Sequence, residues 1–146
     1  MSARLDELLA SIERSGRLVV ERTTLAAADC ATIAADPRLA RAHEIRLVDV
    51  ALDEAALATL LASPHLDGLR VLVLQNVGGA FAPLLAFPRL DRLEKLDLRF
   101  NDVSYATRNF YDGGDLSTPS YTVDPDPTCV ALHARLGDRV LCDMGA

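Results

Sequence analysis

The chain has 146 residues, of which half are hydrophobic and a quarter charged, so it is large enough for one domain and too apolar to be disordered. The 21 acidic and 15 basic residues give a formal net charge of −6, which disfavours a broad phosphate-binding surface and with it nucleic acid as a partner. The three cysteines are too few and too scattered for a disulfide framework. We therefore expect residues 1–146 to form a single domain with reduced thiols.

Residues 1–16 predict a helical cap at the start of the domain. Ser2 is suited to the N-cap and Gly16 to the end of such a helix. The apolar residues that recur on its one face are Leu5, Leu8, Leu9 and Ile12. The segment lacks the apolar centre of a secretory signal, and no apolar stretch of the chain approaches the ~20 residues that span a bilayer. We therefore expect a cytoplasmic protein with no membrane partner.

A repeated pattern occupies residues 17–103. The segments 34–47, 61–74 and 85–98 align at offsets of 27 and 24 residues. The alignment superposes a pair of apolar residues with L-x-L spacing and one proline in each copy, namely Pro37, Pro64 and Pro88. A step of 27 residues back from Ile45 reaches Leu18, which begins one further copy. The sequence therefore predicts about four structural repeats.

Each repeat predicts one strand and one helix. The L-x-L spacing is typical of a short strand with two side chains facing inward. The alanine- and leucine-rich segment before it has helical spacing, and the proline disfavours helix at the residue that precedes it. Because a strand and a helix within about 25 residues cannot bury their own apolar side, successive copies must stack, with the strands in a parallel sheet and the helices outside.

This pattern resembles that of leucine-rich repeat proteins. Residues 93–103, LEKLDLRFNDV, match the family pattern L-x-x-L-x-L-x-x-N-x-L with valine for the last leucine. The earlier copies carry Val77, Val50 and Thr23 at the asparagine position. The segment LLASPHLDGLRVLVL is similar to bacterial repeats of this kind. The resemblance implies an α/β fold, namely a short right-handed solenoid with a parallel sheet on the concave face and helices on the convex face. For function it implies a recognition scaffold.

The C-terminal flank, residues 104–146, departs from the repeat. Residues 104–128 show no helical period and contain a Gly-Gly pair and three prolines, which predicts an irregular loop. Within this loop, residues 121–123 are a candidate edge strand. Residues 129–136 predict a short helix and residues 139–142 a final strand. We therefore expect an irregular loop followed by a C-terminal cap.

The C-terminal cysteines and a histidine raise the alternative of a metal site. Cys129 and His133 are four residues apart, so a helix would place them on one face, where Cys142 could join them as part of a zinc site. No fourth ligand is evident, and cysteine as a small core residue is the simpler interpretation. The sequence also lacks nucleophile-elbow, phosphate-loop and carboxylate-pair motifs. We therefore expect no catalysis, no cofactor and no metal, with an enzyme or a metal-dependent regulator that uses this Cys/His cluster as the alternative.

The side chains between the registered leucines are expected on the concave sheet face. That face combines charges with exposed valines, which suits protein recognition better than catalysis. The sequence therefore predicts a protein–protein interaction module or a small subunit of a complex. An immunity or inhibitor protein is a further alternative, because it would share this surface and differ only in its target. The partner-binding residues expected on the face are Arg46, Val48, Val73, Gln75, Asp97 and Arg99.

The aromatic residues cluster next to this face. The chain has only four Phe and three Tyr, and five of these lie between residues 100 and 121. Aromatic side chains dominate interface hot spots. We therefore expect this segment to contribute to a hetero-complex or a homodimer, through Phe100, Tyr105, Phe110 and Tyr111. The alternative is that these rings fold inward and cap the last repeat.

Overall fold

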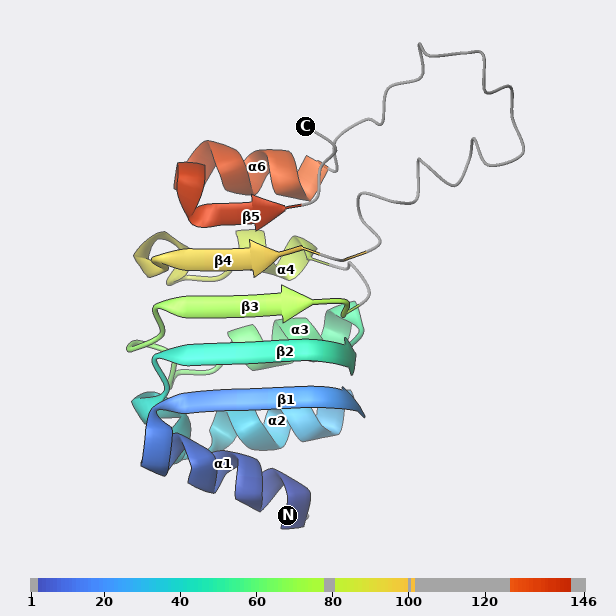
Figure 1. Cartoon of the computed structure of the whole chain (residues 1–146), viewed down its shortest axis with the longest axis vertical. Coiled ribbons are helices and arrows are strands. Elements are labelled where there is room, and N and C mark those ends of the chain that lie inside the picture. The colour runs from blue at the N-terminus through green and yellow to red at the C-terminus, as the bar shows by residue number, and fades with distance from the viewer. Residues whose placement is uncertain (1–2, 78–80, 100, 102–126, 143–146) are drawn as a thin grey trace, which may run out of the picture.

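A five-stranded parallel β-sheet forms the centre of the computed structural model, which describes residues 3–77, 81–99, 101 and 127–142 (Figure 1). The strands lie side by side in chain order. They are β1 (Arg17–Thr24), β2 (Glu44–Ala51), β3 (Val71–Gln75), β4 (Lys95–Leu98) and β5 (Val140–Cys142). All neighbouring strands are parallel, so each connection must return to the edge at which the strands begin. The α/β class and the parallel sheet expected from the sequence are confirmed.

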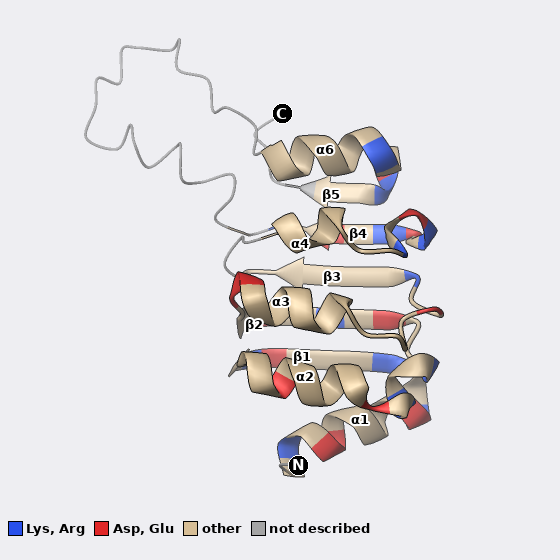
Figure 2. Ribbon diagram, turned by 180° about the vertical axis from the view of Figure 1, so that it is seen from behind, with Lys and Arg blue, Asp and Glu red and all other residues tan. Residues whose placement is uncertain are grey.

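The helices that connect the strands lie on one side of the sheet, as both views show (Figures 1 and 2). They are α2 (Ala27–Ala35), α3 (Glu54–Leu61), α4 (Ala82–Leu85) and α6 (Pro127–Leu136). Three 3₁₀ turns lead into strands, namely η1 (Pro37–Arg41), η2 (Leu90–Arg92) and η4 (Gly137–Arg139). No described element lies over the opposite face of the sheet.

The three repeated prolines follow the ends of helices, as the sequence predicts. The helices α2, α3 and α4 end two or three residues before Pro37, Pro64 and Pro88 respectively. At the other end of α3, the Asp53 carboxylate accepts a hydrogen bond from the Ala56 N–H at 2.7 Å, which caps the helix. The helix α4 has only four residues, where α3 has eight. The shorter helix accounts for the shorter repeat offset at this point of the chain.

The apolar rows predicted from the alignment form the core. The strand register pairs Leu18 with Ile45, Ile45 with Leu72, and Leu72 with Leu96. Val140 in β5 continues this row beside Leu96. All five side chains are buried and belong to one hydrophobic cluster that also includes the inner faces of the helices. The leucine register derived from the sequence is therefore confirmed.

An unusual backbone conformation recurs at the same position of successive repeats. Arg22, Asp49 and Asn76 are each 27 residues from the next, and they have φ angles of 54°, 56° and 53°. Non-glycine residues rarely adopt this left-handed conformation. The Asn76 side-chain amide donates a hydrogen bond to the Asp49 carboxylate at 2.8 Å, which links two of these positions across neighbouring repeats.

The expected N-terminal helix is present as α1 (Ala3–Ser15), which packs against β1 and η1 at one end of the sheet (Figure 1). Its buried residues are Leu5, Leu9 and Ile12. Gly16 ends the helix with a φ of 72°, and a Cβ at this position would lie 2.5 Å from Nδ1 of His43. The backbone conformation therefore favours glycine here, and a larger residue would also displace the exposed imidazole of His43. The proposed N-cap, Ser2, lies outside the described residues.

The short helix and final strand predicted at the C-terminus are also present. The helix α6 begins at Pro127, two residues earlier than expected, and β5 begins at Val140. Most of the irregular loop, including the candidate edge strand at residues 121–123, lies outside the described residues. Within the part of the chain that the structure describes, no helix is long and apolar enough to cross a membrane.

Candidate functional site

The face of the sheet opposite the helices, here called the open sheet face, carries the side chains between the core rows. The register places Val19, Arg46, Val73 and Asp97 side by side in one column on this face. It also pairs Glu21 with Val48 and Val48 with Gln75 in a second column. Leu141 in β5 lies next to Asp97 and extends the first column by one strand. Sequence reasoning missed Leu141, although it had predicted the strand that contains it.

Asp97 organises a hydrogen-bonded cluster on the open sheet face. Its two carboxylate oxygens accept hydrogen bonds from Nε and an Nη of Arg99 at 3.0 and 2.8 Å. They also accept from the Arg99 backbone N–H at 3.1 Å and from the Gln75 side-chain amide at 2.9 Å. The spacing of two residues in a strand puts Asp97 and Arg99 on one face, so the sequence contained the signal for this ion pair.

The electrostatics of this cluster favour the charged carboxylate. The Asp97 side chain is only 2% exposed, and this burial by itself favours the neutral form. The hydrogen bonds from Arg99 and Gln75 outweigh the burial, so the pKa of Asp97 lies below its ordinary value. Asp97 is therefore an ionised group that is already fully partnered, and its role is to fix the positions of Arg99 and Gln75.

Two of the predicted partner-binding residues, Val73 and Asp97, are buried, which corrects the expectation that both present exposed surface. Val73 is 1% exposed, and the register places Arg46 and Asp97 on either side of it. The strand alternation predicted the face of each side chain correctly. It could not predict the burial of these two side chains, because exposure on a sheet face also depends on the side chains of the neighbouring strands.

The remaining predicted residues on the open sheet face are half-buried. Arg46, Val48, Gln75 and Arg99 each retain part of their surface in contact with solvent. The Arg46 guanidinium is also paired with Glu44 at 3.5 Å. Half-buried Val19 and Val71 add apolar surface next to these residues. The four predicted aromatic residues, Phe100, Tyr105, Phe110 and Tyr111, lie outside the described residues.

A shallow pocket of about 630 Å³ lies at the edge where β1, β2 and β3 end. Its polar lining includes Asp49, Asp53 and Asn76, which make the hydrogen bonds across repeats and at the start of α3 given above. The described lining contains no histidine, cysteine or lysine that could act as a base or nucleophile. A second groove of about 510 Å³ between α3 and α4 is lined mainly by alanine, proline, Leu61 and Phe87.

The structure describes the side chains of two of the three residues in the alternative Cys/His site. Cys129 is buried on the inner side of α6, and His133, one turn later, is half-buried. The side chain of Cys142 lies outside the described part of the structure. Among the described residues, no group of three histidine, cysteine or acidic side chains is placed to hold a metal ion.

Comparisons with protein-family models, with curated proteins and with solved structures found no significant match to the chain.

Proposed function

We propose that the chain is a short leucine-rich-repeat solenoid that acts as a non-catalytic protein–protein interaction module, or as a small subunit of a complex. It binds its partner through the open sheet face and residues 100–121. The observation that carries this proposal is that, within the described residues, helices cover only one face of the parallel sheet. Parallel sheets in compact domains are usually covered on both faces. In solenoids the uncovered face is the extended surface that binds other proteins.

The repeat geometry supports a leucine-rich-repeat solenoid. Strand follows strand in chain order, and the sheet register follows the repeat alignment. Asn101, which occupies the asparagine position of the family pattern, is buried. Its side-chain oxygen accepts a hydrogen bond from the Val77 N–H at 2.7 Å, so it links its own repeat to the previous one.

The chemistry of the open sheet face suits a protein partner. Half-buried Val19, Val48 and Val71 offer apolar surface, while the Glu44–Arg46 and Asp97–Arg99 pairs supply fixed polar groups between them. Charges that are already paired present a smaller desolvation cost to a partner than single charges do. A surface that combines apolar side chains with ordered polar groups has the mixed composition found in specific protein complexes.

A matched pair of charge insertions tests this assignment. Affinity capture from a lysate of the source organism should recover the partner with the unchanged protein and lose it with Val48→Arg, which places a cation on the open sheet face. Val130→Arg makes the same change on α6, where Val130 is 48% exposed, and should leave capture unchanged. Urea unfolding of both variants checks that the fold is retained. Capture that survives Val48→Arg in a folded protein would overturn the proposed function.

A further inference from the structure

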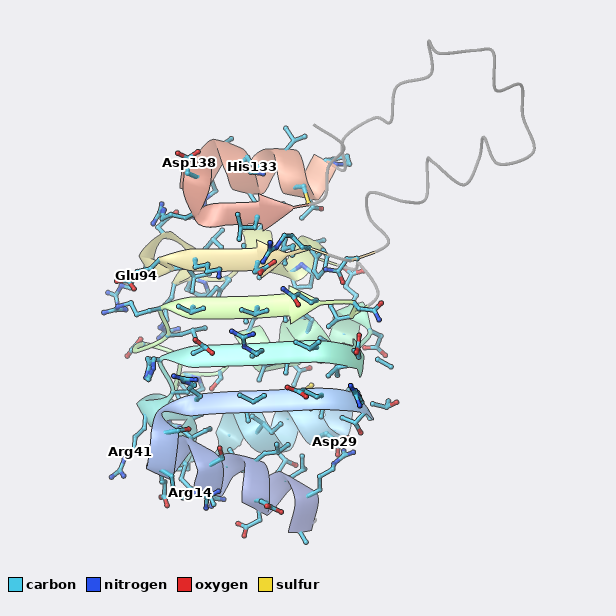
Figure 3. The ribbon with its side chains drawn as sticks, viewed as in Figure 1. Arg14, Asp29, Arg41, Glu94, His133 and Asp138 are labelled. Carbon is cyan, nitrogen blue, oxygen red and sulfur yellow. The ribbon has the colours of Figure 1, made fainter. Side chains whose placement is uncertain are left out.

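The edge of the sheet at which the strands begin, here called the amino edge, carries an excess of positive charge. It comprises the first residues of β1 to β5 and the turns that lead into them. Figure 3 labels two of its cations, Arg14 and Arg41, at this edge. Its exposed basic residues that form no ion pair within the described chain are Arg14, Arg17, Arg41, Arg70, Arg92 and Lys95.

The repeat places two of these cations in one register row, with Glu44 and Val71 between them. Arg17 in β1 and Lys95 in β4 occupy the same register row, three strands apart. Arg139 extends this row, because it lies one residue before Val140, which pairs with Leu96. Arg14 and Arg41 occupy equivalent positions two residues before Gly16 and His43, which are joined by a hydrogen bond from the His43 N–H to the Gly16 carbonyl at 2.9 Å.

The carboxylates at the amino edge neutralise it only in part. Glu44 is paired with Arg46, Asp67 with Arg89, and Asp91 with Arg135, so these acids do not offset the free cations. Asp6 and Asp36 share Arg38, so this group leaves one negative charge uncompensated. At the amino edge, the acidic residues that have no ion pair within the described chain are Glu13, Glu94 and Asp138, which are fewer than the free cations. The amino edge is therefore positive on a chain whose formal net charge is −6.

The opposite edge, where the strands end, has the reverse balance. Exposed Glu21, Asp49, Asp53 and Glu54 lie there, and Arg22 is the one cation at this edge without an ion pair among the described residues. Figure 2 shows acidic residues at the start of α3 and basic residues at the starts of β1 and β4. Because the charge is separated along the strand direction, an acidic partner segment is attracted to one edge and repelled by the other.

We propose that the amino edge binds an acidic polypeptide segment of the partner protein. This inference rests on the proposed function, and it adds the chemistry and the position of one part of the partner. Arg17 and Lys95 are separated by three strand spacings, which is a distance of about 14 Å. Four or five residues of an extended peptide span this distance. Arginine side chains bind carboxylates with paired, charge-assisted hydrogen bonds. Glu94, Asp138 and the net charge of −6 oppose the denser charge of nucleic acid.

A labelled decaglutamate peptide tests the inference without the natural partner. Fluorescence anisotropy at low ionic strength should show saturable binding to the full chain, and this binding should weaken as salt is added. Arg41→Gln/Arg70→Gln should weaken it at least tenfold. Arg4→Gln/Arg22→Gln makes the same change in net charge at the opposite edge and should alter binding less than twofold. Circular dichroism and urea unfolding confirm that both double variants are folded.

Each other outcome overturns the inference. No binding, or equal losses in the two double variants, would mean that the amino edge is not the site. Tighter binding of a duplex DNA probe than of decaglutamate would assign the edge to nucleic acid, and self-association that only Arg41→Gln/Arg70→Gln abolishes would assign it to a second copy. Because this assay needs no partner, its failure is distinguishable from failure of the Val48→Arg capture experiment.

Discussion

The side-chain amide of Asn101 donates a hydrogen bond to the backbone carbonyl of Leu74 at 2.7 Å, and so joins the end of β4 to the end of β3. The same amide nitrogen also lies within hydrogen-bond distance of the Leu98 and Arg99 carbonyls, at 2.8 and 3.2 Å. With the bond from the Val77 N–H, one buried side chain satisfies backbone groups of two repeats. Asn101 therefore connects backbone groups at the ends of β3 and β4 through its side chain.

We predict that Asn101→Ala lowers the free energy of unfolding by about 3 kcal/mol, because it leaves buried backbone donors and acceptors without partners. Urea denaturation followed by circular dichroism measures the loss. Asn76→Gly is the matched control. It removes an exposed amide and keeps a residue that accepts a positive φ, and it should cost less than about 1 kcal/mol. A loss for Asn101→Ala no larger than that of the control would contradict the role given to Asn101.

The repeat alignment predicted the architecture because the core of a stacked α/β fold depends on residues that recur at fixed positions. Leu18, Ile45, Leu72 and Leu96 were aligned from the sequence, and the sheet pairs them in that order. The final strand was also predicted, although a segment of different pattern precedes it. Stacking requires apolar residues at each turn of the chain, so such residues reveal both the elements and their order.

The candidate site was predicted less completely, because exposure on a sheet depends on neighbouring side chains. Alternation placed Val73 and Asp97 on the correct face, but it carries no information on whether Arg46, Gln75 or Arg99 covers them. The positive amino edge was also missed. Its cations come from four different repeats and from α1, so they meet only after the repeats stack.

The central leucines should dominate stability. Leu72 is fully buried in the middle of the first core row, so Leu72→Ala should lower the free energy of unfolding by roughly 2–5 kcal/mol. Leu85→Ala is the control, because Leu85 is 36% exposed, and it should cost less than about 1 kcal/mol. Urea titration of both variants measures the difference. A Leu72→Ala protein as stable as Leu85→Ala would be inconsistent with the register of the sheet.

The aromatic segment should contribute to association and not to the core. We predict that Phe110→Ala/Tyr111→Ala abolishes capture of the partner, because aromatic side chains supply much of the binding energy of an interface, and that it leaves urea unfolding unchanged. Size-exclusion chromatography with light scattering reports whether a homodimer is lost instead. A large drop in stability would assign these rings to a cap on the last repeat and would remove them from the binding surface.

Cys30 should be unreactive in the native protein. The side chain is buried in α2, and this burial, together with the nearby Asp29 and Asp53 carboxylates, raises the pKa of the thiol to about 11. We predict that iodoacetamide at pH 8 labels Cys30 at least a hundredfold more slowly in the native protein than in urea, because only the thiolate reacts. Peptide mass spectrometry measures both rates. Rapid native labelling would show that α2 opens readily from the core.

The Asp97 cluster should make the stability of the protein sensitive to acid. Because the pKa of Asp97 is lower in the folded chain than the unfolded value of about 3.9, the unfolded state binds more protons as the pH falls. The stability that Asp97 contributes is therefore fully present above that unfolded pKa, and it is lost as the pH falls through the folded one. Asp97→Asn should lower stability at pH 7 and reduce the further loss between about pH 4.5 and 2.5. The pKa of Asp36 is also lowered, chiefly by the hydrogen bond from Arg38, so the Asp97→Asn protein still loses some stability in acid.

Urea unfolding across this pH range measures how steeply the free energy of unfolding depends on pH. Asp138→Asn is the control, because Asp138 is an exposed carboxylate that has no ion pair among the described residues. Equal slopes for Asp97→Asn and Asp138→Asn would show that the contacts with Arg99 and Gln75 do not couple protonation of Asp97 to folding.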